Sequence, residues 1–427
     1  MWKKRRWLLA GLMFLAGIVN YMDRSALSIA APVMSTDLSL SPVELGYVFS
    51  SFFFGYAIFN FVGGLLADRL GPFRVMSIAM GVWSVFCAAT AFAGGFVSLL
   101  VIRVIFGVGE GPFSTTLNRQ VANWFPRKEV GTAVGITNGG TPLGGAIAGP
   151  LVGFCVITFG WRPAFVIVGM FGLIWLAAWL LLASNDAETD PRVSEAERQE
   201  ILSDRPHVVG SFRGPGLLQH LRRPIVLATA FAFFGYNYIL FFFISWFPSY
   251  LTMARHLSMK DMSLVTVIPW VLGCVGLVGG GFLVDFVYRR TGNALFSRKI
   301  VLVCCLGAAA VAIALAGQMT TAPSAVALVA VTIFALYLTG STYWAIVQDA
   351  VPRENVGGVG GFVHGLANCS GIIGPTITGY IVQETGSFNS AFALAGAIAV
   401  AGVLGVLVFV REPAVPKVPQ AGAVASP

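Results

Sequence analysis

Charged side chains are scarce in this sequence, and their scarcity excludes a water-soluble globular protein. Only 11% of the 427 residues are Asp, Glu, Lys or Arg, whereas 56% are hydrophobic and the mean hydropathy is +0.80. Soluble domains carry about 25% charged residues. The hydrophobic residues form runs of about 20, and a helix of that length crosses the roughly 30 Å hydrocarbon core of a bilayer. The sequence therefore predicts an all-α polytopic membrane protein.

The sequence also lacks the motifs of enzymes and receptors. No metal-spaced His/Cys cluster, Ser-His-Asp set or P-loop is present, and no signalling domain is appended. The six cysteines lie within hydrophobic runs without a C-x-x-C pair, so we expect buried free thiols. We therefore expect no enzyme, no cofactor and no bound metal, and an ATP-driven pump is equally unsupported.

The net charge is +8, but its distribution argues against a nucleic-acid partner. Lys and Arg occur in short clusters between hydrophobic runs and form no basic stripe. With the N-terminus in the cytoplasm, most of them fall on the cytoplasmic side, and only Arg162, Arg255 and Lys260 fall on the other. Such a bias indicates that both termini and the central loop are cytoplasmic.

Twelve hydrophobic spans are predicted, and a hydrophilic stretch separates them into two sets of six. The spans cover residues 8–31, 43–66, 75–95, 97–117, 131–155, 163–183, 225–250, 264–286, 300–318, 324–347, 357–382 and 390–410. We expect an N-terminal six-helix bundle over 1–184, a cytoplasmic linker with solvated charges over 185–223, a C-terminal six-helix bundle over 224–411 and a disordered cytoplasmic tail over 412–427.

The two halves repeat the same residues at the same spacing. Residues 125–127, Phe-Pro-Arg, are followed by Gly131, and residues 351–353, Val-Pro-Arg, are followed by Gly357. A duplication of six spans predicts two pseudo-symmetric bundles, and transporters of this architecture move one bundle against the other around a central site.

Four charged residues lie deep within otherwise apolar spans: Asp23 and Arg24 in the first, Arg103 and Glu110 in the fourth. Such a charge costs about 2.5–3.5 kcal/mol unless it faces a partner or water, so we expect a shared polar cavity. Arg24 offers a planar donor fork for a substrate carboxylate, while buried acids such as Asp23 and Glu110 can exchange protons near neutral pH. The alternative is a closed ion-pair network that only locks the helices. Neighbours on a helix point about 100° apart, so one network does not easily include both Asp23 and Arg24.

Several motifs resemble those of the major facilitator superfamily. Residues 64–74, Gly-Leu-Leu-Ala-Asp-Arg-Leu-Gly-Pro-Phe-Arg, resemble its loop motif. Residues 20–24, Asn-Tyr-Met-Asp-Arg, and Arg103 followed by Glu110 resemble its anion:cation symporter branch. That branch includes bacterial galactonate, glucarate and hexuronate permeases and the animal sialin and vesicular glutamate carriers. The resemblance covers all twelve spans. It implies a monomeric proton symporter of the bacterial inner membrane that imports a small organic anion, such as an aldonate, aldarate or uronate, by a rocker-switch movement.

The resemblance also implies further substrate contacts. It suggests that Arg103 pairs with Asp23 or Glu110 and tunes their proton affinity. Relatives often have Asn where this chain has His364, which leaves three roles open: donation to the anion, a proton relay, or structure. The aromatic and polar residues that would complete the site are Tyr21, Tyr56, Ser341, Trp344, His364 and Asn368.

A second charged group is expected at the cytoplasmic ends of the spans. Asp68, Arg69 and Arg74 follow the second span, and Asp285 is their partial counterpart in the second half. These residues are expected to latch the cytoplasmic gate rather than to bind substrate. Proton-coupled efflux of an amphipathic drug or metabolite is the alternative function. The glycine-rich fifth span favours efflux, whereas the two arginines at mid-membrane favour anion uptake.

Overall fold

The computed structural model describes residues 4–204, 217–351 and 355–411, in which every regular element is a helix. The first half contains α1 (Arg5–Asp37), α2 (Pro42–Leu70), α3 (Pro72–Ala89), the 3-10 turn η1 (Thr90–Phe92), α4 (Phe96–Glu110), α5 (Phe113–Trp124), α6 (Arg127–Phe159), α7 (Trp161–Leu182) and α8 (Glu195–Ser203). The second half contains α9 (Leu217–Leu221), α10 (Pro224–Met253), α11 (Met259–Val265), α12 (Val267–Thr291), α13 (Ala294–Gln318), α14 (Ala322–Thr339), α15 (Thr342–Ala350), α16 (Val356–Thr385) and α17 (Asn389–Phe409).

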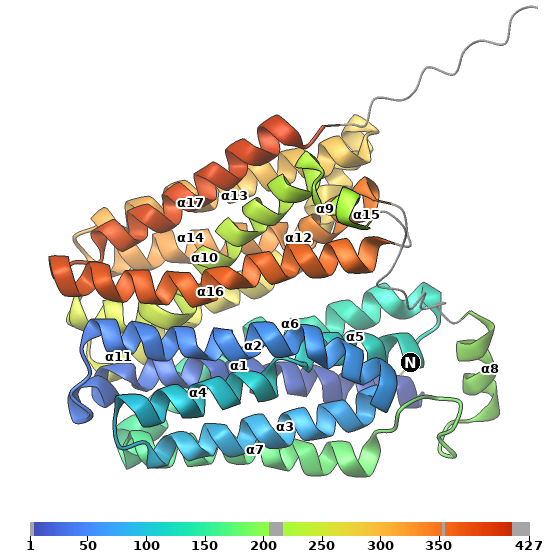
Figure 1. Cartoon of the computed structure of the whole chain (residues 1–427), viewed down its shortest axis with the longest axis horizontal. Helices are drawn as coiled ribbons and strands as arrows, with labels where there is room; N and C mark the ends of the chain where they lie inside the picture. The colour runs from blue at the N-terminus through green and yellow to red at the C-terminus, as the bar shows by residue number, and fades with distance from the viewer. Residues whose placement is uncertain (1–3, 205–216, 352–354, 412–427) are drawn as a thin grey trace, which may run out of the picture.

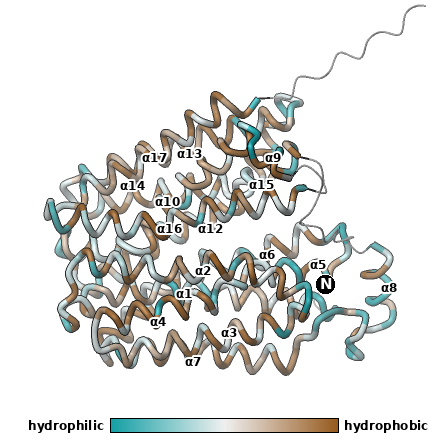
Figure 2. Tube along the Cα trace, viewed as in Figure 1, coloured by the Kyte–Doolittle hydropathy of each residue, from teal (hydrophilic) through white to brown (hydrophobic). Residues whose placement is uncertain are grey.

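The helices form two bundles that lie side by side (Figure 1). Within the described residues, eleven helical segments are long and apolar enough to cross a membrane. The 33-residue α1 is not among them, because Asn20, Asp23 and Arg24 lower its hydropathy. Together with α1 these segments make twelve spans, so the predicted fold class is confirmed. Hydrophobic residues line the helices, and hydrophilic ones gather around α8 and the N-terminus (Figure 2).

The fourth and tenth spans are each broken inside the bundle. α4 ends at Glu110, and α5 begins at Phe113 after Gly111 and Pro112. Pro112 has no N–H to donate, so it removes one hydrogen bond of a continuous helix. In the second half, Gly340 and Ser341 separate α14 from α15 in a similar way. The break places Glu110 at a helix end in the interior of the first bundle.

The two halves touch closely at the end of the molecule that carries α11, which we call the α11 end. Three hydrogen bonds join them in the described residues: Val43 N to Gln383 Oε1 (3.4 Å), the hydroxyls of Tyr47 and Tyr380 (2.7 Å), and Thr376 Oγ1 to Ser50 Oγ (2.8 Å). All three connect α2 and α16. Toward the opposite end, where α8 lies, the helices of the two bundles diverge (Figure 1). The halves are therefore closed against each other at the α11 end.

Glycine makes this closure possible. A Cβ atom at Gly46 would lie 2.7 Å from the Pro375 carbonyl oxygen, and one at Gly379 would lie 2.5 Å from the Pro42 carbonyl oxygen. No side chain fits at such distances, so α2 and α16 meet main chain to main chain.

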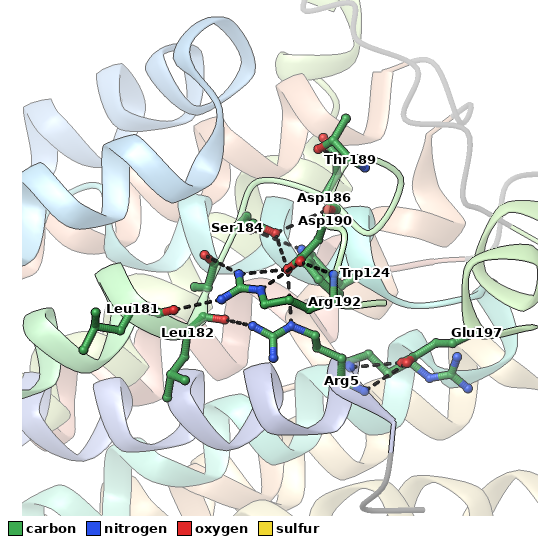
Figure 3. A network of polar contacts seen from close by, with 12 residues as sticks. Arg5, Trp124, Leu181, Leu182, Ser184, Asp186, Thr189, Asp190, Arg192 and Glu197 are labelled. Carbon is green, nitrogen blue, oxygen red and sulfur yellow. Dashed lines mark hydrogen bonds and ion pairs between the residues drawn. The ribbon is translucent and has the colours of Figure 1, made fainter. Parts of the chain in front are cut away.

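The expectation of solvated charges in the linker is wrong for two acids within residues 185–204, although Glu188, Arg192 and Glu195 are exposed. Asp190 and Glu197 are buried, with 2% and 5% of their surface exposed. Asp190 Oδ2 accepts hydrogen bonds from Arg5 Nε at 3.2 Å and Ser184 Oγ at 3.0 Å, and Arg192 Nε donates to Oδ1 at 2.9 Å (Figure 3). Burial raises the pKa of Asp190, but these hydrogen bonds outweigh it and hold the pKa below its usual value. The segment is thus docked on the first half.

Glu197 and Glu200 fix the beginnings of α1 and α6. Glu197 accepts hydrogen bonds from the main-chain N–H groups of Arg5 and Arg6, at 3.0 and 3.1 Å, and so caps the first turn of α1 from a distant segment. Glu200 pairs with Lys4 and Arg6 of the N-terminus and with Lys128 of α6. Hydrogen bonds from Lys4, Arg6 and Lys128 lower the pKa of Glu200 to about 2. Glu200 is therefore ionised throughout the physiological pH range.

The cysteine expectation is only partly correct. All six cysteines are free, but only Cys87 and Cys155 are buried, and Cys304 is exposed. Cys304 lies in α13, and a membrane helix presents apolar residues outward as well as inward, so a hydrophobic run alone does not indicate burial.

Candidate functional site

The four intramembrane charges lie together in the first half and are almost completely buried. Asp23 and Arg24 come from α1, and Arg103 and Glu110 come from α4; none exposes more than 6% of its surface. α2 reaches the same region because Gly107 of α4 lets it approach. A Cβ atom there would lie 2.1 Å from the Phe52 carbonyl oxygen.

Arg24 forms an ion pair with Glu110 inside an aromatic enclosure. Both Nε, at 2.9 Å, and Nη2 of Arg24 donate to the same oxygen, Oε1. The Glu110 Oε2 atom has no hydrogen-bond partner in the described residues. The Arg24 guanidinium carbon lies 5.1, 5.0 and 4.9 Å from the ring centres of Tyr21, Phe52 and Tyr56. The Arg24 guanidinium thus donates to one carboxylate oxygen only, although its planar N–H groups can bind both oxygens of a carboxylate at once.

Asp23 and Arg103 do not join this pair. Neither oxygen of Asp23 has a hydrogen-bond partner in the described residues, although the Trp83 indole lies near. The Arg103 guanidinium packs over Phe52 and Phe106, at 5.0 and 4.6 Å. Arg103 thus forms no hydrogen-bonded ion pair with Asp23 or Glu110 in the described residues, but its charge acts on both acids, and its influence on their proton affinity stays a prediction. The side chain of Glu110, at the end of α4, reaches Arg24 on α1 instead.

A buried carboxylate without a partner is costly as an anion, because desolvation is not repaid by an opposite charge or a hydrogen bond. Asp23 is fully buried and has no such bond in the described residues. Protonation removes most of this cost. Asp23 therefore lies near a second buried acid, Glu110, whose Oε1 atom is paired with Arg24.

The second half faces this charge cluster with aromatic residues. The rings of Tyr21 and Trp270 meet edge to face at 5.7 Å across the two halves, and Tyr236 and Tyr337 also lie near Tyr21. Sequence reasoning did not single out Trp270, Tyr236, Tyr337 or Phe52. Their only signal was an aromatic residue within a predicted span, which packing explains equally well.

Ser341, Trp344, His364 and Asn368 lie in a separate group in the second half. The Asn368 amide nitrogen donates to the His364 carbonyl oxygen at 2.9 Å and lies 3.1 Å from His364 Nδ1. The ring centres of Trp344 and His364 are 5.6 Å apart, and Trp344 is 41% exposed. Ser341 is exposed at the start of α15. Within the part of the chain that the structure describes, no hydrogen bond or ion pair joins these four residues to Arg24.

The candidate gate residues lie at the α8 end and do not join the two halves here. Asp68 pairs with Arg119 of α5 at 3.5 Å, within the first half. Arg69, Arg74 and Asp285 are exposed. Arg119 was not among the candidates, because its approach to Asp68 depends on how α2 and α5 pack. In the described residues no group of three or more His, Cys, Asp or Glu could hold a metal ion.

Comparisons with known proteins agree with this geometry. The family model described as Major Facilitator Superfamily matches residues 13–362 and 293–426. The chain is 52% identical over 405 residues to the hexuronate transporter of Bacillus subtilis (strain 168), covering 93% of each protein. It is 34% identical to the probable sulfoacetate transporter SauU of Cupriavidus necator, covering 94% of this chain and 93% of the relative. It is 31% identical to the probable galactarate/D-glucarate transporter GudP of Bacillus subtilis, covering 95% and 92%.

Among solved structures, the crystal structure of a D-xylose-proton symporter resembles this chain with a TM-score of 0.75. The match covers 95% of this chain and 98% of that chain at 17% sequence identity. At this identity the likeness shows a shared fold and nothing about the substrate.

Proposed function

The chain belongs to the major facilitator superfamily, and we propose that it imports a sugar acid together with protons across a bacterial inner membrane. It is a multi-pass membrane transporter and not an enzyme. Relatives named for hexuronate and for galactarate/D-glucarate support a sugar acid as the substrate. The efflux alternative gains no support from these relatives.

The proposal rests on one observation. Within the aromatic enclosure, a single oxygen of Glu110 accepts the hydrogen bonds of both Nε and Nη2 of Arg24. A substrate carboxylate makes two parallel hydrogen bonds to a guanidinium and so competes with Glu110 for it. Once displaced, Glu110 is a buried carboxylate without a partner, and proton uptake relieves that cost. Binding of the substrate carboxylate to Arg24 therefore raises the affinity of Glu110 for a proton, and protonation of Glu110 in turn raises the affinity of Arg24 for the substrate.

Asp23 is the second proton site in this proposal. It lies next to Arg24 in the chain, and neither of its oxygens has a hydrogen-bond partner in the described residues. Arg103, packed on Phe52 and Phe106, contributes a fixed positive charge beside both acids. The aromatic residues of the second half complete the site around the sugar.

A rocker-switch movement fits the contacts between the halves. Placing both termini and α8 in the cytoplasm makes the described state closed to the outside, at the α11 end, and divergent toward the cytoplasm. In the opposite state, Asp68, Arg69, Arg74 and Asp285 would approach one another and latch the cytoplasmic side. All the proposed residues belong to one chain, so a monomer suffices for transport.

Replacement of Glu110 by glutamine tests the proposal. The amide keeps the size of the side chain but cannot take up a proton, so uphill uptake of labelled D-glucuronate driven by a pH gradient should fail in proteoliposomes. Exchange of labelled for unlabelled substrate need not reset that proton and should persist. Arg289→Lys, at an exposed position on α12, is the control and should retain both activities. Uphill accumulation by Glu110→Gln would show that Glu110 is structural and that the coupling residue is Asp23 or His364.

A further inference from the structure

We infer that Trp270 closes the substrate site toward the α11 end, and that its ring must leave a notch at Gly145 before a sugar acid can reach Arg24 from that side. This inference rests on the proposed function, because it takes Arg24 as the group that binds the substrate carboxylate and the α11 end as the outer end. It gives a gating role to a residue of the second half.

Gly145 on α6 provides a notch that the Trp270 ring of α12 fills. A Cβ atom at Gly145 would lie 2.4 Å from Cδ2 and Cε2, the two carbon atoms shared by both rings of the indole. The indole therefore occupies the space that any side chain at position 145 would need. Trp270 is buried, with 4% of its surface exposed. Because α6 belongs to the first half and α12 to the second, separation of the halves withdraws the ring from the notch.

Gly149 and Gly153 extend this notch into a groove along α6. A Cβ atom at Gly149 would lie 2.4 Å from the Ser263 carbonyl oxygen, and one at Gly153 would overlap with Ser263 Oγ. Residues four apart lie on one face of a helix, so Gly145, Gly149 and Gly153 form a continuous groove that α11 and the first turn of α12 fill. This groove gives the glycine-rich fifth span a role in closure of the α11 end.

Tyr21 connects Trp270 with Arg24. The rings of Tyr21 and Trp270 meet edge to face with their centres 5.7 Å apart, and the Arg24 guanidinium carbon lies 5.1 Å from the centre of the same Tyr21 ring. Trp270 is therefore one aromatic ring away from the group that binds the substrate carboxylate. Phe243 of α10 packs against Trp270 with ring centres 5.0 Å apart, so the indole is supported from within the second half and moves with it.

The seam between the halves beyond Trp270, toward the α11 end, is almost filled. Its cavity has a volume of about 20 Å³ and is lined by Ser25 and Ser28, which follow Arg24 along α1, and by Gly149, Thr266 and Trp270, among others. A single water molecule needs a cavity of about 10–15 Å³, so this one holds a water molecule but is far too small for a sugar. A sugar acid therefore enters from the α11 end only after the indole has left its notch.

The reactivity of a thiol in this cavity tests the inference. After replacement of the six native cysteines, Ser28→Cys places one thiol where Ser28 is 2% exposed. Gly145→Ala adds a methyl group for which the indole leaves no room, and overpacking of this kind shifts a balance between states by about 5- to 150-fold. A membrane-impermeant maleimide added outside whole cells should therefore label this thiol at least about fivefold faster. Gly135→Ala, on the same helix but with nothing within 4 Å of its Cβ atom, should leave the rate unchanged.

Trp270→Leu separates the role of the indole from a general loosening of the helices. Leucine loses the contacts that the indole makes in the closed state, so labelling at Ser28→Cys should again be at least about fivefold faster. Gly145→Ala should add nothing further in this background, because its methyl group then has space. Unchanged labelling in a folded Trp270→Leu protein, or an equal effect of Gly145→Ala in both backgrounds, would overturn the inference.

This measurement is independent of the proposed function. Labelling of the thiol requires no transported anion, so either contrary result would leave sugar-acid uptake intact. Failure of every sugar acid to support counterflow in proteoliposomes would overturn the proposed function instead. If Gly145→Ala does not fold, the labelling rate of Trp270→Leu decides the inference.

Discussion

Replacing Gly379 by alanine is expected to open the α11 end of the transporter. A Cβ atom at Gly379 would lie 2.5 Å from the Pro42 carbonyl oxygen and 3.2 Å from the Cα atom of Val43. Ordinary contacts of this kind begin at 3.4 Å, so α2 and α16 must separate locally by about 0.9 Å. Both opposing atoms belong to the main chain, and no side-chain rotation relieves the clash.

The magnitude follows from the cost of overpacking. An extra methyl group in a well-packed contact typically costs about 1–3 kcal/mol. This strain exists only in the state in which α2 and α16 touch, so it changes the balance between conformers more than the stability of either bundle. A cost of about 1–3 kcal/mol shifts that balance by about 5- to 150-fold toward the state open at the α11 end.

The assay is a distance measurement between spin labels on the two halves at this end. After replacement of the six native cysteines, labels at Thr36 and Glu384, both exposed, report the separation. Gly361→Ala is the matched control, because it makes the same substitution on the same helix where a Cβ atom meets nothing within 4 Å. Gly379→Ala should populate longer distances and Gly361→Ala should not. Identical distance distributions for the two variants would refute the argument that this contact controls closure.

Three further predictions concern the charged groups. Arg24→Lys keeps the charge but loses the planar fork, so substrate affinity should fall at least about tenfold in a thermal-shift titration with D-glucuronate, and near-normal affinity would contradict the carboxylate clamp. Glu197→Gln weakens the cap on α1 and should lower the unfolding free energy by about 1 kcal/mol, with faster proteolysis within residues 185–204; an unchanged cleavage rate would show that the cap is dispensable. Because the pKa of Glu200 is lowered from 4.5 to about 2, its contribution to docking is complete above pH 4.5 and is lost as the pH falls toward 2. Proteolysis of this segment should therefore be constant from pH 8 to pH 5 and rise only in stronger acid, and a change near pH 6 would point to another group.

The sequence allowed the fold and the charge cluster to be predicted because both have strong local signals. Hydrophobic runs of membrane length reveal the spans. Asp23 and Arg24 are conspicuous because ionisable residues are rare at that depth. The partner of Arg24 was harder to predict, because the choice between Glu110 and Asp23 depends on where α4 ends and on how closely α2 approaches. Both follow from helix packing, which hydropathy does not report.

The docking of residues 185–204 had no usable signal in the sequence. Its contacts join residues far apart in the chain, such as Arg5 with Asp190 and Arg6 with Glu200. A hydrophilic stretch rich in Glu and Arg has the composition of a solvated linker. Charged residues become buried when each finds an opposite charge, and that pairing is determined by the tertiary structure.

The confinement of all four intramembrane charges to the first half also bears on how the membrane voltage acts on the protein. A conformational change is voltage-sensitive only to the extent that it carries net charge through the field, about 2.3 kcal/mol per elementary charge per 100 mV. Here one moving part is a bundle with two buried acids and two buried arginines, and the other is a bundle whose α10, α14 and residues 356–382 of α16 hold no Asp, Glu, Lys or Arg. The gating charge of the empty protein is therefore that of the first bundle alone, and it changes by one elementary charge with each proton that Asp23 or Glu110 binds.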